Sequence, residues 1–275
     1  MRKTAAVVLA LWAAGCGRAD GEKQPPPSYD VTQVASPELL RRANHGRTIE
    51  GADGRFVMPR GVRRAWIDIG AHLLEQTRAE LERNDDVAVI AIEPLEECWQ
   101  AWPDNPRLVA LPVAISLERG FMDFQVNAEN ATSSLLKSVE GNSVSELTRT
   151  VQIRKVPVLR LEDVLERIPP EVEVEFVKID VQGHDLQVLK SAGEQIRRVE
   201  KVQAEVINEK IYEGSGELRP GTEAEFVSYM QSKGFRFEED TAVHMHREWL
   251  DKVFVNPARQ GWRDRARRRL LSLLP

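Results

Sequence analysis

Cysteine is nearly absent from this chain. The 275 residues include only Cys16 and Cys98. Two cysteines exclude a disulfide framework, and they are too few for a cysteine-based metal site. If the thiol of Cys16 is modified, Cys98 has no disulfide partner within the chain.

Two further absences narrow the class of protein. No charge of one sign dominates, because 38 Lys and Arg residues face 43 Asp and Glu residues and the net charge is −5. This balance argues against a general nucleic-acid binder. Internal repeats are also lacking, and an apolar fraction of 42% is ordinary for a soluble globular protein. A chain of this length is long enough to bury a full core.

The first residues resemble a bacterial secretion signal. Arg2 and Lys3 precede a short apolar run, residues 4–15, which is too short to span a bilayer. Small residues directly before Cys16 resemble a lipobox, which implies cleavage before Cys16 and attachment of lipid to its thiol. Three hypotheses stay open: a membrane-anchored lipoprotein, an ordinary secreted or periplasmic protein, and a cytoplasmic protein whose start codon is misassigned.

Composition divides the chain into four segments. These are a signal peptide at residues 1–15, a flexible proline-rich linker at 16–36, a folded domain at 37–258 and a basic tail at 259–275. The tail carries six arginines beside four leucines. It fits either a solvated terminal helix or a segment lying on an anionic membrane surface.

Within the folded domain, short apolar runs alternate with segments of helical spacing. The runs predict strands at residues 63–70, 87–94, 107–116, 120–127, 150–159, 172–180 and 200–207. The helical pattern predicts helices at residues 71–83, 160–168, 184–196 and 221–234. Alternating patterns at 235–240 and 249–257 predict a C-terminal hairpin. The fold class is therefore α/β, with a mostly parallel sheet, an antiparallel C-terminal hairpin and helices on both faces.

Ligands in such sheets bind at the carboxyl ends of strands, where the order of the strands reverses. That rule brings residues 68–71, 93–94 and 180–185 to one edge. Gly70 permits a tight turn and a close approach of a ligand to the backbone. Glu93 follows about 20 residues later, where an acid binds ribose hydroxyls in nucleotide-binding folds. An exposed acid at a strand end is the alternative interpretation of Glu93.

The junction at 180–185 carries more charge than a turn requires. Asp185 has a sufficient structural explanation, since an acid favours a helix N-terminus. Asp180 has none, and a carboxylate at a strand end is suited to orienting a substrate hydroxyl or a cationic cofactor. His184 is either a base beside Asp180 or an ordinary turn residue at the helix N-terminus.

Taken together, these segments resemble the FkbM-type S-adenosylmethionine-dependent methyltransferases over roughly residues 66–257. The stretch VKIDVQGHDLQVLKSA is similar to the family signature KIDVEG-E--VLKGA, with Gln182 in place of the usual Glu. WIDIGAH is similar to the family's first cofactor loop, AIEP to its second strand end, and LPVAIS to its third. The motifs occur in the family's order along the chain.

The resemblance implies a class I methyltransferase (Rossmann-like) fold and S-adenosylmethionine as the cofactor. It places Asp68, Gly70 and Ala71 beside the methionine part, Glu93 on the ribose hydroxyls, and Ala114 near the adenine. Asp180 is expected to face the transferred methyl group or its acceptor, with His184 as a candidate base. The implied reaction is methyl transfer to a hydroxyl oxygen of a sugar or another small molecule.

Two departures from the family pattern fall in the first cofactor loop. Leu74 stands where the family has a second glycine, and His72 stands where it has an asparagine. We expect Leu74 to add bulk near the methionine pocket, which reshapes the start of the helix or impairs cofactor binding. With the export signal, Leu74 motivates an alternative function: an exported, lipid-anchored binding protein with a degenerate methyltransferase fold. An export signal also conflicts with a cofactor that is made in the cytosol.

No metal site is expected. His244 and His246 lie on one face of a predicted strand, as a two-residue metal clamp does, but no third ligand is evident near them. Ordinary strand residues are the simpler interpretation.

Overall fold

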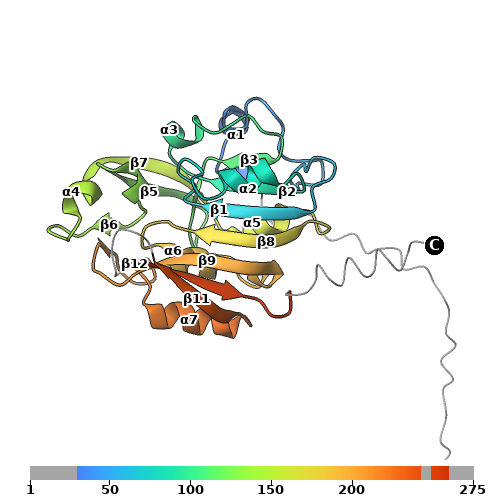
Figure 1. Cartoon of the computed structure of the whole chain (residues 1–275). Helices are drawn as coiled ribbons and strands as arrows, with labels where there is room; N and C mark the ends of the chain where they lie inside the picture. Colours follow the sequence, from blue (N-terminus) through green and yellow to red (C-terminus); the bar gives the residue numbers. More distant parts are fainter. Residues whose placement is uncertain (1–29, 243–248, 260–275) are drawn as a thin grey trace, which may run out of the picture.

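The computed structural model describes residues 30–242 and 249–259 (Figure 1). Its main element is a seven-stranded sheet. In spatial order the strands are β3 (Leu108–Leu111), β2 (Val87–Ile92), β1 (Arg64–Ile69), β8 (Glu173–Ile179), β9 (Val199–Ile207), β12 (Trp249–Val255) and β11 (Arg236–Ala242). In these two ranges, no helix has both the length and the apolarity needed to cross a bilayer.

The strand directions confirm the predicted fold. β1, β2, β3, β8 and β9 pair in parallel, while β12 is antiparallel to both β9 and β11. The chain builds outward from β1 to β3 and then returns to the other side of β1 with β8. The order therefore reverses between β1 and β8, and this is where parallel sheets of this type hold their ligands. The C-terminal hairpin is present as expected.

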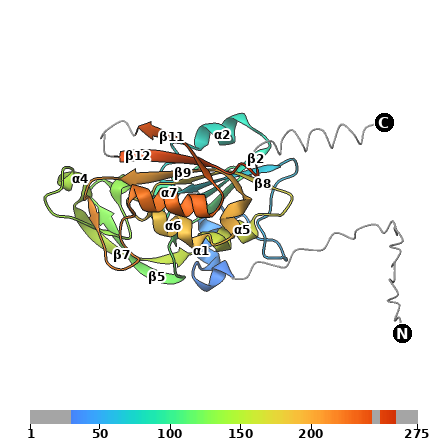
Figure 2. The same cartoon turned by 90° about the horizontal axis from the view of Figure 1, so that it is seen from below.

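Helices cover both faces of the sheet, as predicted (Figure 2). One face carries α5 (Leu161–Arg167), α6 (Asp185–Ser191) and α7 (Glu223–Ser232). The other carries α2 (Arg78–Arg83), and the short helix α3 (Glu96–Trp99) follows β2. At the β3 edge lies α1 (Pro37–Ala43), preceded by the 3-10 helix η1 (Val31–Gln33), while the 3-10 helix η3 (Gln195–Arg198) leads into β9.

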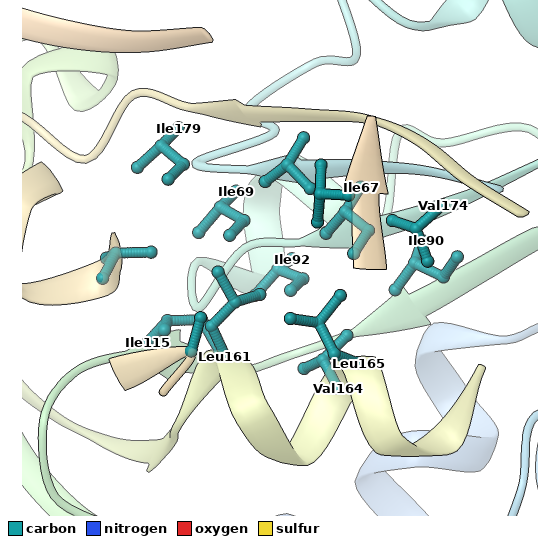
Figure 3. Packing of buried hydrophobic residues seen from close by; sticks show 14 of the residues in the cluster. Ile67, Ile69, Ile90, Ile92, Ile115, Leu161, Val164, Leu165, Val174 and Ile179 are labelled. Atoms are coloured by element: carbon teal, nitrogen blue, oxygen red, sulfur yellow. The ribbon is translucent and has the colours of Figure 1, made fainter. Parts of the chain in front are cut away.

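The main core lies between the sheet and α5 (Figure 3). Strand side chains Ile67, Ile90 and Ile92 are at most 1% exposed and face Leu161 and Leu165 of α5. Parallel strands are buried on both faces, which explains why they read as continuous apolar runs in the sequence. Each such side chain contributes about 1.5–3 kcal/mol by leaving water.

A second, smaller sheet is inserted between β3 and α5. Its strands are β4 (Ala114–Ile115), β7 (Thr150–Leu159) and β5 (Gly120–Asn127). The connecting segment contains the 3-10 helix η2 (Asn130–Thr132), α4 (Ser145–Thr148) and β6 (Lys137–Ser138), which pairs with β10 (Tyr212–Glu213). Figure 1 shows this insertion beside one end of the central sheet.

Three predicted elements are shorter than expected, each for a local reason. The strand predicted at 107–116 is divided between two sheets at Pro112, which has no N–H to donate to a sheet. The helix predicted at 71–83 begins only at Arg78, because His72 and Leu74 have positive φ angles of 41° and 64°. The helix predicted at 184–196 ends at Ser191, before Gly193, whose φ is 55°.

The predicted linker at 16–36 extends too far. Val31 and Ala35 are fully buried and belong to the main core, and Asp30 caps η1 by accepting a hydrogen bond from Thr32 N. The ordered domain therefore includes residues 31–36. The rest of the linker, the signal segment and the tail after Arg259 lie outside the described residues.

The side chain of Asn44 joins α1 to the edge strand β3. It is fully buried; its amide nitrogen donates to Leu40 O and Ala110 O, both at 2.8 Å. Its amide oxygen accepts from Ala110 N at 2.8 Å. A side chain thus occupies hydrogen-bonding positions that a further strand would otherwise fill, which protects the edge.

We predict that Asn44→Ala lowers the free energy of unfolding by about 2–3 kcal/mol, because Ala110 loses both partners while buried. Asn44→Asp is expected to be at least as destabilising, since it keeps one acceptor but loses both donors and buries a charge. Urea denaturation measures both. A loss below about 0.5 kcal/mol for either variant would show that water replaces the amide.

Candidate active site

A cleft of about 250 Å³ lies at the carboxyl ends of β1, β2 and β8. Its apolar wall comes from strand ends and the inserted segment: Ile69, Ile92, Val113, Ile115, Phe124 and Leu135. Its polar lining includes Glu93, Asp180, His72, Asn130 and Lys178. A mostly apolar hollow with a few fixed polar groups is the usual form of a small-molecule site.

The turn after β1 requires glycine at position 70. Gly70 has a φ of 73°, and a Cβ atom there would lie 1.8 Å from Asp180 O. Asp180 N in turn donates to Ile69 O at 3.0 Å. The loops that follow β1 and β8 are therefore in backbone contact, and any side chain at 70 would separate them.

The structure places the seven predicted site residues in two groups. Five of them line the cleft: Gly70, Glu93, Ala114, Asp180 and His184. Asp68 and Ala71 are both 1% exposed and lie beneath the loop instead. Asp68 accepts a hydrogen bond from Thr77 Oγ1 at 2.7 Å, so it holds the loop from below.

Sequence reasoning missed Lys178, which connects the two motifs. Its ammonium group is 3.3 Å from Asp68 Oδ1 and 3.5 Å from Asp180 Oδ2, and it donates to Gly70 O at 3.0 Å. Burial alone would lower the pKa of Lys178, but the charges of Asp68 and Asp180 outweigh it and raise that pKa. The signal in the sequence was a lysine within an otherwise apolar strand end, VKID.

Glu93 directly follows β2, and backbone N–H groups donate to both of its carboxylate oxygens. Oε1 accepts from Leu95 N at 2.9 Å, and Oε2 accepts from His72 N at 3.2 Å. Burial raises the pKa of Glu93 to about 7, although these hydrogen bonds oppose the shift. The alternative interpretation of Glu93 as an exposed strand-end acid is wrong, because Glu93 is only 6% exposed and lines the cleft.

The signature loop is closed by its own side chains. Asp185 is fully buried and accepts from Val181 N at 3.3 Å and Gly183 N at 3.1 Å. Burial, reinforced by the charge of Asp180, raises the pKa of Asp185 to about 8. Asp185 therefore fixes the loop in addition to starting α6.

Gln182 bridges two acidic groups. It has a φ of 58°, and its amide nitrogen donates to Asp180 Oδ1 at 2.8 Å and Glu205 Oε2 at 3.1 Å. Its amide oxygen accepts from Tyr212 OH at 2.9 Å. Burial, followed by the charges of Asp180 and Asp185, raises the pKa of Glu205 well above its usual range. A glutamate at 182 could not donate to both carboxyl groups, so the glutamine suits this environment.

His184 is buried at the first turn of α6. Its Nε2 lies 2.9 Å from Ser116 Oγ, and burial lowers the pKa of the imidazole to about 4. At neutral pH the ring is therefore uncharged. His184 is only 1% exposed, and it forms part of the wall of the cleft.

Leu74 reshapes the start of the helix, as one of the two expectations held, but it does not lie in the cleft. Its side chain is fully buried and packs with Leu81, Trp99 and Trp102 beneath the loop, in a cluster separate from the lining of the cleft. The leucine therefore leaves the cleft open. The family's glycine position corresponds here to a left-handed backbone that leucine adopts at some cost.

No group of three or more His, Cys, Asp or Glu side chains with metal-binding geometry occurs in the described part of the chain. His244 and His246 lie outside the described residues. Cys98 is buried without a disulfide, and burial raises the pKa of its thiol to about 12.

We predict that Leu74→Gly lowers the free energy of unfolding by about 1–3 kcal/mol, because the lost core contacts exceed the relief of the left-handed backbone. Leu74→Ala, which loses the contacts without that relief, should be about 1 kcal/mol less stable than Leu74→Gly. Chemical denaturation measures both variants. An unchanged stability with a larger ligand-accessible cleft would contradict the position of Leu74.

One family model and several solved structures are similar to this chain. The family model described as the methyltransferase FkbM domain matches residues 68–237, well over half of the chain. No curated protein matches the sequence. Similar solved structures include the 1,6-didemethyltoxoflavin-N1-methyltransferase of Burkholderia thailandensis, with 11% identity, coverage of 71% of this chain and 72% of that one, and a TM-score of 0.36.

Another is the magnesium protoporphyrin IX methyltransferase of Synechocystis PCC 6803, with 8% identity, coverage of 72% and 75%, and a TM-score of 0.38. Both were solved with S-adenosylhomocysteine bound. The family assignment rests on the family model, whose matched region contains every strand end that lines the cleft. This chain belongs to the FkbM family of S-adenosylmethionine-dependent methyltransferases.

Proposed function

We propose that the protein transfers the methyl group of S-adenosylmethionine to a hydroxyl oxygen of a sugar or another small molecule. The observation that carries this proposal is the meeting of Gly70, Glu93 and Asp180 in one cleft at the reversal of strand order. The cofactor supplies an activated methyl group on a sulfonium. The chain supplies a binding site, an aligned acceptor and a dry environment.

The lining of the cleft fits the parts of this cofactor. The Glu93 carboxylate, fixed by two backbone N–H groups, has remaining lone pairs for ribose hydroxyls. Val113, Ala114 and Ile115 form an apolar wall suited to the adenine. The bare backbone at Gly70 permits close approach of the methionine part.

Asp180 is the best placed group to orient the acceptor. Its side chain is 30% exposed and lines the cleft, while Lys178 and Gln182 fix it from behind. A carboxylate held in this way can accept a hydrogen bond from a hydroxyl and take its proton as the oxygen–carbon bond forms. His184 suits this role less well, because its pKa is about 4 and its Nε2 faces Ser116.

The inserted segment completes the acceptor side. Phe124, Asn130, Ser133 and Leu135 contribute to the wall opposite the strand ends. One aromatic ring and several small polar groups suit a hydroxylated acceptor such as a sugar. The alternative of a binding protein with a degenerate fold is less well supported. It assumed that Leu74 obstructs the cleft, and Leu74 does not line the cleft.

The proposal for the place of action rests on the sequence alone. We propose that the protein is exported and anchored through Cys16, with the basic tail as a second contact to an anionic surface, which requires that S-adenosylmethionine made in the cytosol is supplied to it there. Mass spectrometry of the native N-terminus distinguishes a lipidated Cys16 from a secreted chain and from a cytosolic chain that begins downstream.

We predict that S-adenosylhomocysteine binds the wild-type protein and that Glu93→Ala weakens this binding by about tenfold to a hundredfold, because a charge-assisted hydrogen bond to the ribose is lost. Isothermal titration calorimetry measures the dissociation constants. Glu82→Ala, on the exposed face of α2, is the matched control. Failure of the folded wild-type protein to bind S-adenosylhomocysteine or S-adenosylmethionine would rule out the proposed function.

We predict that Asp180→Asn lowers kcat by about a hundredfold to ten-thousandfold, the usual contribution of a positioned base, with little change in the affinity for S-adenosylhomocysteine. Release of S-adenosylhomocysteine in a panel of sugars and small hydroxylated molecules provides the assay. His184→Gln should lower kcat by a smaller factor than Asp180→Asn does. The reverse order would make His184 the base.

A further inference from the structure

The side chain of His72 spans the cleft from one wall to the other. Its Nε2 lies 2.8 Å from Asn130 Oδ1 in η2, and its Nδ1 lies 2.8 Å from Glu75 Oε1. All three residues line the cofactor cleft, and Glu75 lies at its solvent-exposed rim. The bridge joins the loop after β1 to a wall of the inserted segment 58 residues away.

Both ring nitrogens of His72 face oxygen acceptors. A neutral imidazole carries a single N–H and cannot donate to both, whereas an imidazolium can. The Asn130 amide nitrogen faces Cys98 Sγ at 3.9 Å, and its oxygen faces His72. With the Asn130 oxygen facing the ring, this geometry favours a charged imidazole.

The groups around His72 favour that charge. Burial acts to lower the pKa of His72, but hydrogen bonds to Glu75 and Asn130 and the charges of Glu75 and Glu93 outweigh it, so the pKa is raised. From β2, Glu93 faces the backbone N–H of His72. The thiol of Cys98 in α3 stays neutral, because its pKa is raised. The charge of Lys178 in β8 lowers the pKa of Glu93.

The backbone of His72 is held in place independently of its side chain. Its φ is 41°, and its carbonyl accepts from Trp102 Nε1 at 2.7 Å. The family's asparagine at this position has a shorter side chain and could not span the same gap from the same backbone. The substitution therefore adds a connection across the cleft.

We propose that the charged His72 side chain is a latch that holds η2 against the loop after β1, and that it must open for the cofactor to be exchanged. This proposal rests on the proposed function, because the cleft it closes is the site assigned to S-adenosylmethionine. The latch retains bound cofactor by holding the two walls of the cleft together.

The direction in which the rate of cofactor exchange changes with pH follows from the protonation of the His72 imidazole. A histidine whose pKa is raised in the folded state contributes its bonds fully below the unfolded value of about 6.5. The bonds are lost as the pH rises through the raised pKa. Exchange of the cofactor should therefore become faster as the pH rises through that value.

Two measurements test the latch. NMR titration of the imidazole signals in the free protein gives the pKa of His72, which His72→Asn identifies by loss of its signal. Stopped-flow displacement gives the rate of S-adenosylhomocysteine release. His45→Asn is the matched control, because His45 is also in a left-handed conformation but is exposed and away from the cleft.

We expect Glu75→Gln to lower the pKa of His72 and Asn130→Asp to raise it, because the first removes and the second adds a carboxylate beside the ring. His72→Asn should release S-adenosylhomocysteine about tenfold faster and remove the pH dependence that His72 contributes, since two charge-assisted bonds are lost. The release rate of Asn130→Asp should begin to rise only at higher pH than that of the wild type.

The results separate the latch from the proposed function. A pKa of His72 at or below 6.5 in the free protein, or a release rate unchanged by His72→Asn, overturns the latch even where the cofactor binds. If S-adenosylhomocysteine fails to bind every variant, the proposed function fails. In that case a raised pKa of His72 that shifts as expected still establishes the bridge, though not its role in cofactor exchange.

Discussion

The site depends on the two ion pairs and the hydrogen bond that the ammonium group of Lys178 makes. Lys178 and Asp68 are partners in the register of β8 and β1, so their side chains share one face of the sheet. A buried cation and a buried carboxylate are tolerable only as a pair, and removal of one member of such a pair typically costs about 3–5 kcal/mol. Because the same ammonium also reaches Gly70 O and Asp180, both functional loops are fixed by a single charge.

Several further hydrogen bonds hold the two loops that carry the functional groups. Asp185 and Gln182 hold the loop after β8, and Thr77 holds Asp68 beneath the loop after β1. Asp180 is left as a partly exposed carboxylate between these fixed parts. Preorganised polar groups of this kind do not need to reorient when charge moves during a reaction.

The sequence predicted the sheet well because parallel strands are buried on both faces and their apolar runs are unmistakable. It also predicted that Gly70, Glu93 and Asp180 share one edge, since strand ends follow from strand order. It could not predict the partners of His72 or Lys178, which are set by contacts between residues 58 and 110 positions apart. Nor could helical spacing show that residues 71–77 are turns, because the positive φ of Leu74 is stabilised by its distant contacts with Trp99 and Trp102.

The two departures from the family's first loop have a common effect. A loop with glycine at 74 would lack the core contacts that the leucine makes here, and asparagine at 72 has a shorter side chain than histidine. Here Leu74 anchors the loop to the core below, and His72 connects it to η2 across the cleft. Contacts of these two side chains, on opposite sides of the loop, thus restrict its backbone. Cofactor binding to a loop already ordered in this way requires less loss of conformational entropy, so the substitutions are consistent with a working site.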